Sequence, residues 1–229
     1  MIRLGKTTLQ YYSDFHIINK IPVIKQLSNN IALCGDIGNP FDKNYSDFFE
    51  QLSNNYDNVF IIAGNHEYWQ HKYRMQDVDD KINDIVCKFS NINFLNKSSA
   101  KLDDHTVAGC TLWTKRNMMS FDNKKIINNN NKLISINDVN NLHNDHVKFI
   151  KDTISTCDKL IVLTHHLPTY RLVSTKYRKE PYIYYQSLCS SDLDHLIKLP
   201  IDAWLCGHSH CVKNIMIGDV YCGINSYKH

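Results

Sequence analysis

Residues 59–67 read Val-Phe-Ile-Ile-Ala-Gly-Asn-His-Glu, an apolar run that ends abruptly in polar residues. Continuous runs of this kind are typical of strands that are buried on both faces in layered α/β proteins. Four other stretches follow the same pattern: Leu9 to Ser13 before Asp14-Phe15-His16, Ile31 to Cys34 before Gly35-Asp36, Leu160 to Thr164 before His165-His166, and Ala203 to Cys206 before Gly207-His208-Ser209-His210. The sequence therefore predicts buried strands with polar ends.

The polar residues that follow these strands are mainly of three types, Asp, Asn and His. Packing alone would favour apolar residues at such positions, so their repetition in one chain indicates a function. Because loops at the carboxyl ends of strands converge on one edge of a layered α/β fold, these residues can meet in one site. Oxygen and imidazole ligands suit manganese, iron, zinc or nickel better than calcium. The sequence therefore predicts a metal cluster.

Composition and length limit the classes of protein to which this chain can belong. No linker or internal repeat divides the 229 residues, which predicts one domain spanning residues 1–229. The apolar fraction of 43% and the charged fraction of 21% are ordinary for globular proteins and argue against disorder. The net charge is +3 and the basic residues are scattered, so no strong nucleic-acid or membrane footprint is present.

Location and redox state are also predicted from the sequence. Residues 1–10 lack the apolar segment of an export signal, and no apolar run is long enough to cross a membrane. The eight cysteines form no CxxC pair and are spread along a chain long enough to build its own core. We interpret them as free thiols and expect a cytoplasmic location, with neither a disulfide framework nor a thiolate zinc site.

The segments between the strands have a different periodicity. Apolar residues recur at helical spacing from Tyr68 to Phe89 and from Asn137 to Ile154, and both segments are expected to cover a sheet face. The stretch from Asn91 to Trp113 predicts two or three strands. Residues Asn214 to Ile224 predict a hairpin that turns at Gly218-Asp219.

Taken in order, the polar motifs resemble those of the calcineurin-like metallophosphoesterase family. The motifs are Asp14-x-His16, Gly35-Asp36-x-x-Asn39, Gly64-Asn65-His66-Glu67, Thr164-His165-His166 and Gly207-His208-Ser209-His210. The resemblance spans nearly the whole chain, and all five blocks appear in the family's order. It implies a four-layer α/β/β/α sandwich with a dimetal site at the carboxyl ends of the strands.

The same resemblance implies two divalent ions and the residues that hold them. It places Asp14, His16 and His210 on one ion, Asn65, His165 and His208 on the other, and Asp36 as a bridge between both. The expected ions are manganese, iron, zinc or nickel. Two such ions would generate a metal-bound hydroxide that attacks the phosphate ester, so no covalent nucleophile from the protein is needed.

The family pattern makes His66 a catalytic group that protonates the leaving alkoxide or stabilises charge on phosphorus. A histidine suits this work because its ordinary pKa lies near neutrality. Glu67 and Asn39 are interpreted as supports rather than ligands. Asn39 stands where an acidic residue is common, and Pro40 stands where an arginine is common, which leaves the substrate contacts open.

Five residues are candidates for contact with the substrate: Asn39, His166, Trp113, Tyr170 and Arg171. His166 is interpreted as a support for a ligand or as a group that faces the substrate. Trp113 ends a strand near the predicted site, where it either walls a pocket or belongs to the core. Tyr170 and Arg171 begin a tyrosine-rich stretch that either stacks a base and binds phosphate or forms a partly packed loop.

The remaining histidines have no assigned role, and most are interpreted as surface residues: His71, His105, His143, His146, His195 and His229. His143 and His146 are three positions apart on a predicted helix, a spacing that also suits a metal. A solvated helix face is the commoner outcome, and it is the one expected here.

Three functions stay open. The first is a dinuclear metal-dependent hydrolase of phosphate esters, diester or monoester, that acts on a phosphorylated small molecule or a nucleotide. The second is a protein phosphatase, which the compact chain and the lack of arginines after the second and third motifs disfavour. The third is a non-catalytic scaffold, which has no need of His66 beside a full ligand set. The sequence favours the first and does not identify the substrate.

Overall fold

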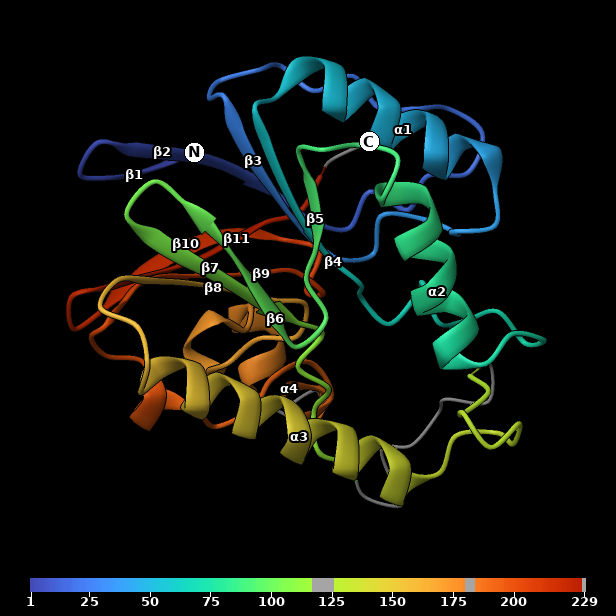
Figure 1. Cartoon of the computed structure of the whole chain (residues 1–229). Coiled ribbons are helices and arrows are strands. Elements are labelled where there is room, and N and C mark those ends of the chain that lie inside the picture. Colours follow the sequence, from blue (N-terminus) through green and yellow to red (C-terminus); the bar gives the residue numbers. More distant parts are fainter. Residues whose placement is uncertain (117–125, 180–183, 228–229) are drawn as a thin grey trace.

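Two β-sheets lie face to face between two layers of helices in the computed structural model, which describes residues 1–116, 126–179 and 184–227 (Figure 1). The first sheet has the order β1-β2-β3-β4-β5, and the second has the order β10-β11-β9-β8-β7-β6. The strands are β1 (Ile2–Leu4), β2 (Thr7–Tyr12), β3 (Asn30–Cys34), β4 (Asn58–Ile62), β5 (Ile92–Phe94), β6 (Ser98–Leu102), β7 (His105–Cys110), β8 (Leu160–Thr164), β9 (Ile201–Cys206), β10 (Val212–Ile217) and β11 (Val220–Asn225). The four-layer sandwich expected from the sequence is confirmed.

The helices cover the outer faces of both sheets. They are α1 (Lys43–Asn55), α2 (Met75–Val86), α3 (Ile136–Ile154) and α4 (Tyr185–Cys189), with short 3-10 helices η2 (Tyr170–Leu172), η3 (Thr175–Arg178) and η4 (Asp194–Leu196). Figure 1 shows α1 and α2 on the side of the first sheet and α3 and α4 on the side of the second. No helix in the described part of the chain is long and apolar enough to cross a membrane.

The apolar residues divide into three clusters, one for each interface between neighbouring layers. The first joins α1 and α2 to the first sheet and contains Phe48, and the second joins α3 to the second sheet and contains Trp204. The third lies between the two sheets and includes Phe60 of β4 and Ile161 of β8. Strands β3 and β8 are buried along their whole length because a layer packs on each of their faces. This is the physical reason for their uninterrupted apolar sequences.

Parallel pairing brings the strand ends to one edge. Strands β2, β3 and β4 run parallel to one another, and so do β7, β8 and β9. Their registers pair Leu33 with Ile61 and Cys110 with Thr164, so the loops that follow these strands leave the sheets at the same level. The residues predicted to bind metal lie on these loops.

One predicted element needs correction, and two elements were not predicted. The helix expected from Tyr68 to Phe89 is shorter, because α2 begins only at Met75, after Arg74 and Asp77 form a capping box. Residues before it form tight turns, in which the Tyr68 and Trp69 amides donate to carbonyls three residues earlier. Helix α1 and strand β1 were not predicted from the sequence.

The other expected elements are confirmed. Helix α3 has the expected extent within one residue and begins at a capping box formed by Ser135 and Asp138. The stretch from Asn91 to Trp113 contains the three strands β5, β6 and β7. Strands β10 and β11 form the expected hairpin, and Gly218 at its turn has a φ of 57°, in the left-handed region that favours glycine.

Candidate metal centre

The loops at this edge approach one another more closely than side chains usually allow. A Cβ added to Gly64 would lie 2.1 Å from Oδ1 of Asp36, and one added to Gly35 would lie 2.5 Å from the Gly64 nitrogen. Only glycine leaves room for this contact, because it has no Cβ. The two glycines therefore allow the β3 and β4 loops to meet beside the Asp36 carboxylate.

Backbone strain is concentrated at the same edge. Five of the seven expected ligands have a left-handed backbone: Asp14 (φ 57°), His16 (45°), Asp36 (54°), His208 (66°) and His210 (47°). A non-glycine residue in this region is disfavoured by about 1–2 kcal/mol. Strained residues that gather in one place are a mark of a functional site, because surrounding structure must hold them there.

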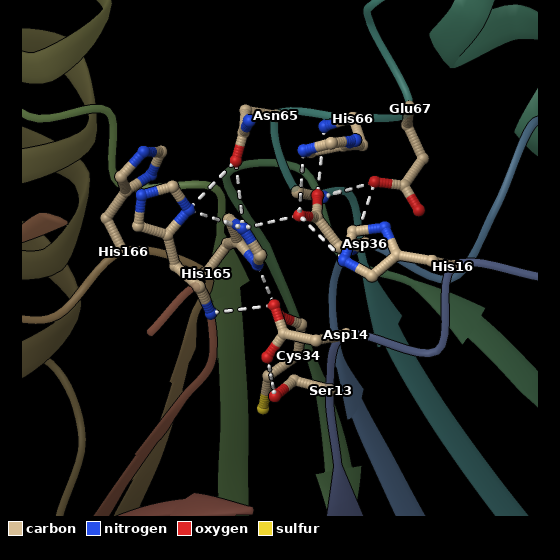
Figure 2. A network of polar contacts seen from close by, with 12 residues as sticks. Ser13, Asp14, His16, Cys34, Asp36, Asn65, His66, Glu67, His165 and His166 are labelled. Atoms are coloured by element: carbon tan, nitrogen blue, oxygen red, sulfur yellow. Dashed lines mark hydrogen bonds and ion pairs between the residues drawn. The ribbon is translucent and has the colours of Figure 1, made fainter. Parts of the chain in front are cut away.

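The Asp36 carboxylate lies at the middle of the cluster and is 1% exposed (Figure 2). Its Oδ1 accepts a hydrogen bond of 2.9 Å from the His66 amide. Its Oδ2 has no hydrogen bond and lies 3.3 Å from Nε2 of His165, 3.8 Å from Nε2 of His16 and 3.9 Å from Nε2 of His66. A buried carboxylate oxygen among ring nitrogens needs a proton or a cation to balance it.

A second group of ligand atoms surrounds His165, which is fully buried. Its Nδ1 donates to the Cys34 carbonyl at 2.8 Å, which leaves the lone pair of the neutral ring on Nε2. That Nε2 faces Oδ1 of Asn65 at 3.0 Å and Nδ1 of His208 at 3.2 Å. Oδ1 of Asn65 also lies 3.0 Å from Nδ1 of His208. The four atoms from Asp36, Asn65, His165 and His208 converge on one point.

A third group lies beside the first. Nε2 of His16 and Nε2 of His210 face each other at 3.3 Å, and their rings are stacked with an interplanar angle of 4°. Oδ1 of Asp14 lies 3.8 Å from Nε2 of His210. Oδ2 of Asp14 accepts hydrogen bonds from Ser13 and Ser226, which hold the carboxylate in place. All seven expected ligands are therefore brought together.

These donor sets fit divalent cations. Three groups of residues place one ligand atom each within 4.8 Å of the others: Asp14 with His16 and His210, His16 with Asp36 and His66, and Asp36 with His165 and His208. Carboxylate, amide and neutral imidazole are ligands for manganese, iron, zinc or nickel. Oδ2 of Asp36, which makes no hydrogen bond, lies where two of these groups meet, in the position that a bridging ligand would take.

Charges in the cluster are coupled. Burial would lower the pKa of His165, but the Asp36 carboxylate outweighs burial and raises that pKa to about 9. Burial likewise opposes ionisation of Asp36, yet the charge of His165 holds the pKa of the carboxyl below its ordinary value. Burial lowers the pKa of His16, His66 and His208, against the attraction of Asp36. Without metal, one proton therefore stays on His165 while these neighbouring imidazoles are neutral.

Glu67 holds the frame of the site, as its interpretation as a support predicts. Its side chain is fully buried, and its two oxygens accept hydrogen bonds from the amides of Asp36, Ile37, Gly38 and Gly64 at 2.6–3.3 Å. Burial, together with the Asp36 charge, raises the pKa of Glu67 to about 7. One side chain thus links the β3 loop to the β4 loop.

His66 lies at the open side of the cluster, with 38% of its side chain exposed. Its ring packs on Trp69, with 3.8 Å between ring centroids, and on His16 at 4.6 Å. Trp69, Ser13 and Ser226 were not predicted to contact the site. The sequence placed Trp69 in a helix and gave no role to the two serines. The signal for Ser13 and Trp69 was their adjacency to motif residues, whereas nothing local marks Ser226.

The residues predicted to contact the substrate lie in different parts of the structure. His166 is fully buried, and its ring lies 4.3 Å from that of His208. Trp113 is 1% exposed and packs against His166, so it belongs to the core. Oδ1 of Asn39 accepts from the Phe41 amide at the turn that leads into α1.

Tyr170 and Arg171 lie in η2, which contacts β10 and β11. Both residues are exposed, and Tyr170 lines a separate cavity of about 660 Å³ with Lys115 and His143. The Lys213 ammonium of β10 donates to the Arg171 carbonyl at 2.6 Å. Part of the tyrosine-rich stretch, residues 180–183, lies outside the described residues. Tyr184 and Tyr185 pack on each other with 4.1 Å between ring centroids.

The interpretation of the other histidines as surface residues is wrong for three of them. His105, His143 and His146 are buried, whereas His71 and His195 are exposed and His229 lies outside the described residues. His105 lies between the carboxylates of Asp104 and Asp202, at 2.9 Å from the first and 3.2 Å from the second. His143 and His146 face inward from α3 because each bonds a backbone group of residues 112–113. All eight cysteines are free thiols, as expected.

Comparison with known proteins agrees with this geometry. The family model for calcineurin-like phosphoesterases matches residues 10–212, which contain all five motifs. The chain belongs to the calcineurin-like phosphoesterase family. Membership of this family implies metal-dependent hydrolysis of phosphoesters, and the resemblance inferred from the motifs is confirmed.

Relatives of this calcineurin-like phosphoesterase include a viral protein and distant structures. An uncharacterized protein of Acanthamoeba polyphaga mimivirus is 32% identical over 96% of this chain and 91% of its own length. The phosphopantetheinyl hydrolase PptH of Mycobacterium tuberculosis has a TM-score of 0.68 at 13% identity, covering 96% of this chain and 89% of that one. A Staphylococcus aureus protein assigned as a 5′-nucleotidase has a TM-score of 0.52 at 14% identity, covering 94% of this chain and 48% of that one. The two structures share the fold.

Proposed function

We propose that this chain is a dinuclear metal-dependent hydrolase of phosphate esters whose substrate is a phosphorylated small molecule or a nucleotide. The observation that carries the proposal is the buried Oδ2 of Asp36, which makes no hydrogen bond and lies between two groups of imidazole nitrogens. A scaffold that only bound partners would have no need of such an arrangement, because burying a carboxylate among imidazoles costs more free energy than packing apolar residues there.

The proposed ligands follow from the three groups. Asp14, His16 and His210 would hold one ion, Asn65, His165 and His208 the other, and Asp36 would contribute to both. When bound, two divalent ions lower the pKa of a water and neutralise charge on a phosphate. The protein fixes the ligands through contacts around them, of which the hydrogen bond from His165 to the Cys34 carbonyl is one.

His66 is the proposed proton donor to the leaving oxygen. A ring nitrogen of His66 lies within 4.8 Å of ligand atoms of His16 and Asp36, a distance that would also suit a metal ligand. Its ring is partly exposed and packs on Trp69, which leaves it accessible to a substrate. Burial lowers the pKa of His66 in the free protein, so it is neutral near pH 7. An anionic phosphate beside the ring would favour the protonated form of His66, and this form would give the proton that the leaving oxygen takes.

The test is hydrolysis of p-nitrophenyl phosphate and bis-p-nitrophenyl phosphate by metal-stripped protein, with manganese, iron, zinc, nickel or magnesium restored singly. We expect release of p-nitrophenol that depends on metal in the wild type. Asp36→Asn should abolish it, and Asp47→Asn, which changes a partly exposed carboxylate outside the site, should not. His66→Ala should keep both ions and lose about 100- to 10,000-fold in rate.

Two outcomes would count against the proposal. Turnover in Asp36→Asn at the wild-type rate would remove the metal role assigned to this cluster. A wild type that binds two ions per chain but hydrolyses neither ester with any of the five metals would instead favour the interaction scaffold, and a search for binding partners would replace the substrate screen.

A further inference from the structure

The ring of His66, the proposed proton donor, makes no hydrogen bond within residues 1–116, 126–179 and 184–227. The carboxylate that it approaches, that of Asp36, has its Oδ2 3.9 Å from Nε2 of the ring, which is too far for a hydrogen bond. A histidine that transfers protons is usually oriented by a partner on its other nitrogen, so that one nitrogen faces the reacting atom. In this chain the direction of the His66 ring therefore depends on packing.

Two aromatic rings provide this packing. The ring of Trp69 lies 3.8 Å from that of His66 between centroids, with an interplanar angle of 34°. The ring of His16 lies 4.6 Å away at an angle of 71°, so it meets His66 edge to face. Both arrangements are favourable for aromatic rings. The His66 ring is thus held between two neighbours, and Trp69 makes the closer contact.

A tight turn brings Trp69 back over His66. The Tyr68 amide donates to the Asn65 carbonyl at 3.2 Å, and the Trp69 amide donates to the His66 carbonyl at 3.1 Å. Each of these hydrogen bonds spans three residues, so the chain reverses immediately after the third motif. The contact between the two rings is therefore set by the backbone of this turn.

The turn is anchored on both sides of Trp69. Tyr68 is buried, and its hydroxyl donates to Oδ1 of Asp79 in α2 at 2.7 Å. The side-chain amide of Gln70 donates to the Glu67 carbonyl at 2.9 Å. Trp69 itself is partly buried and packs against the apolar cluster under α1 and α2. Its position is fixed by the core, so its ring can impose an orientation on the more exposed histidine.

We propose that Trp69 is a positioning residue, which holds the His66 ring in the orientation from which it gives a proton to the leaving oxygen. The proposal deepens the proposed function and rests on it. In this step the bond between phosphorus and the leaving oxygen breaks, the His66 proton passes to that oxygen, and a water supplies the oxygen that replaces it on phosphorus. His66 is left neutral. Its placement matters because a displacement of about 1 Å can cost about 100-fold in rate.

The leaving group separates this role from others. p-Nitrophenolate is a weak base and leaves with little help from a proton, whereas phenolate is more basic and depends on one. A misplaced proton donor therefore slows the hydrolysis of phenyl esters more than that of p-nitrophenyl esters. A residue that only supported the fold or the metal ligands would slow both alike.

The experiment compares Trp69→Leu, Trp69→Phe and the matched control Tyr73→Leu in the manganese-loaded protein, with Trp69→Leu also made in His66→Ala. Tyr73 is a partly buried aromatic residue that packs against the same apolar cluster, and its ring stacks on Phe41 at 3.8 Å. Its variant therefore removes an equivalent contact away from His66. KM and kcat are measured for phenyl and p-nitrophenyl phosphate and for the corresponding diesters. Bound manganese and the unfolding midpoint are measured for each variant.

NMR provides a readout that needs no turnover. In metal-free protein with labelled histidine, the Trp69 ring shields the ring protons of His66, because the two rings lie 3.8 Å apart. These resonances should move downfield in Trp69→Leu and return part of the way in Trp69→Phe. They should stay in place in Tyr73→Leu.

We expect Trp69→Leu to lower kcat about 10- to 100-fold for the phenyl esters and by a smaller factor for the p-nitrophenyl esters. KM and manganese content should not change. Trp69→Phe should recover most of the rate, and Tyr73→Leu should have the wild-type kcat. In His66→Ala the second change should cost less than about 2-fold, because the group that Trp69 positions is already absent.

Three results would overturn the proposal while the proposed function stands. They are equal losses of kcat for both leaving groups, a loss that is fully additive with His66→Ala, and a raised KM with unchanged kcat, which would make Trp69 a substrate contact. A wild type that hydrolyses no ester with any of the five metals would instead contradict the proposed function. The His66 resonances would then decide alone whether Trp69 orients this ring, and unchanged resonances in Trp69→Leu would show that it does not.

Discussion

Metal binding by this protein should release a proton from His165. In the metal-free protein the Asp36 carboxylate, 3.3 Å from Nε2 of His165, raises the pKa of that histidine to about 9. Nδ1 is already committed to the Cys34 carbonyl, so the proton that must leave is the one on Nε2. A metal ion and this proton therefore compete for one lone pair.

The size of the effect follows from the pKa. At pH 7 the imidazole is protonated in about 99% of molecules, so close to one proton is released for each ion bound at this position. At pH 7 the proton lowers the apparent affinity about 100-fold relative to the deprotonated ring, or about 2.7 kcal/mol. Burial lowers the pKa of His16, His66 and His208, so these imidazoles contribute little to the release.

Calorimetry tests this prediction directly. Manganese is titrated into metal-free protein at pH 7 in buffers that differ in ionisation enthalpy, and the slope of the observed heat against that enthalpy gives the protons released. The logarithm of affinity should rise by about one unit per pH unit between pH 7 and 8.5. Asp36→Asn removes the charge that raises the pKa, so NMR titration of the metal-free variant should show His165 titrating well below the wild-type value. Affinity independent of pH, with no proton released, would refute the reasoning.

Three further predictions concern the frame of the site. Glu67→Gln should lose about 2 kcal/mol of unfolding free energy and bind manganese more weakly, since its amide nitrogen cannot accept from two backbone amides; urea unfolding should show no such loss in the exposed control Glu50→Gln. Gly64→Ala should lower manganese affinity at least 10-fold in a titration, because the new Cβ would meet the Asp36 carboxylate 2.1 Å away; an unchanged affinity would contradict the close approach. His146 has a folded pKa of about 3 against about 6.5 unfolded, so stability present above pH 6.5 is lost as the pH falls towards 3. His146→Gln should make urea midpoints less dependent on pH between 4.5 and 6.5, and an identical slope would disprove the assignment.

Much of the fold was predictable because its signals are local. The apolar runs before Asp14, Asp36 and Asn65 are continuous since layers pack on both faces of the strands. Helix α1 was missed although Phe48, Phe49 and Leu52 are buried at helical spacing, because no side chain caps its start and no motif marks it. The start of α2 was misplaced since the apolar residues before Met75 form turns that pack beside the site.

The sequence named the proposed ligands and His66, but it did not show which residues hold them in place. The seven proposed ligands and His66 were named from the resemblance of the motifs to those of the family, and the fold brings these residues together. Ser226 could not be named, because its bond to Asp14 joins residues 212 positions apart. The sequence left open whether Trp113 lines a pocket or belongs to the core. Its side chain is only 1% exposed in the structure, so it belongs to the core.

The sequence by itself determined that residues of metal-ligating types follow the strands and in which order they do so, because both are properties of local composition and spacing. Tertiary structure decided which ligand atoms face one another and which oxygen of Asp36 makes no hydrogen bond. It also decided which residues hold the proposed ligands in place. It also turned His143 and His146 from an expected solvated face into buried side chains that hold the backbone of Leu112 and Trp113. These outcomes depend on contacts between residues far apart in the chain, and a contact of that kind leaves no mark in the local sequence.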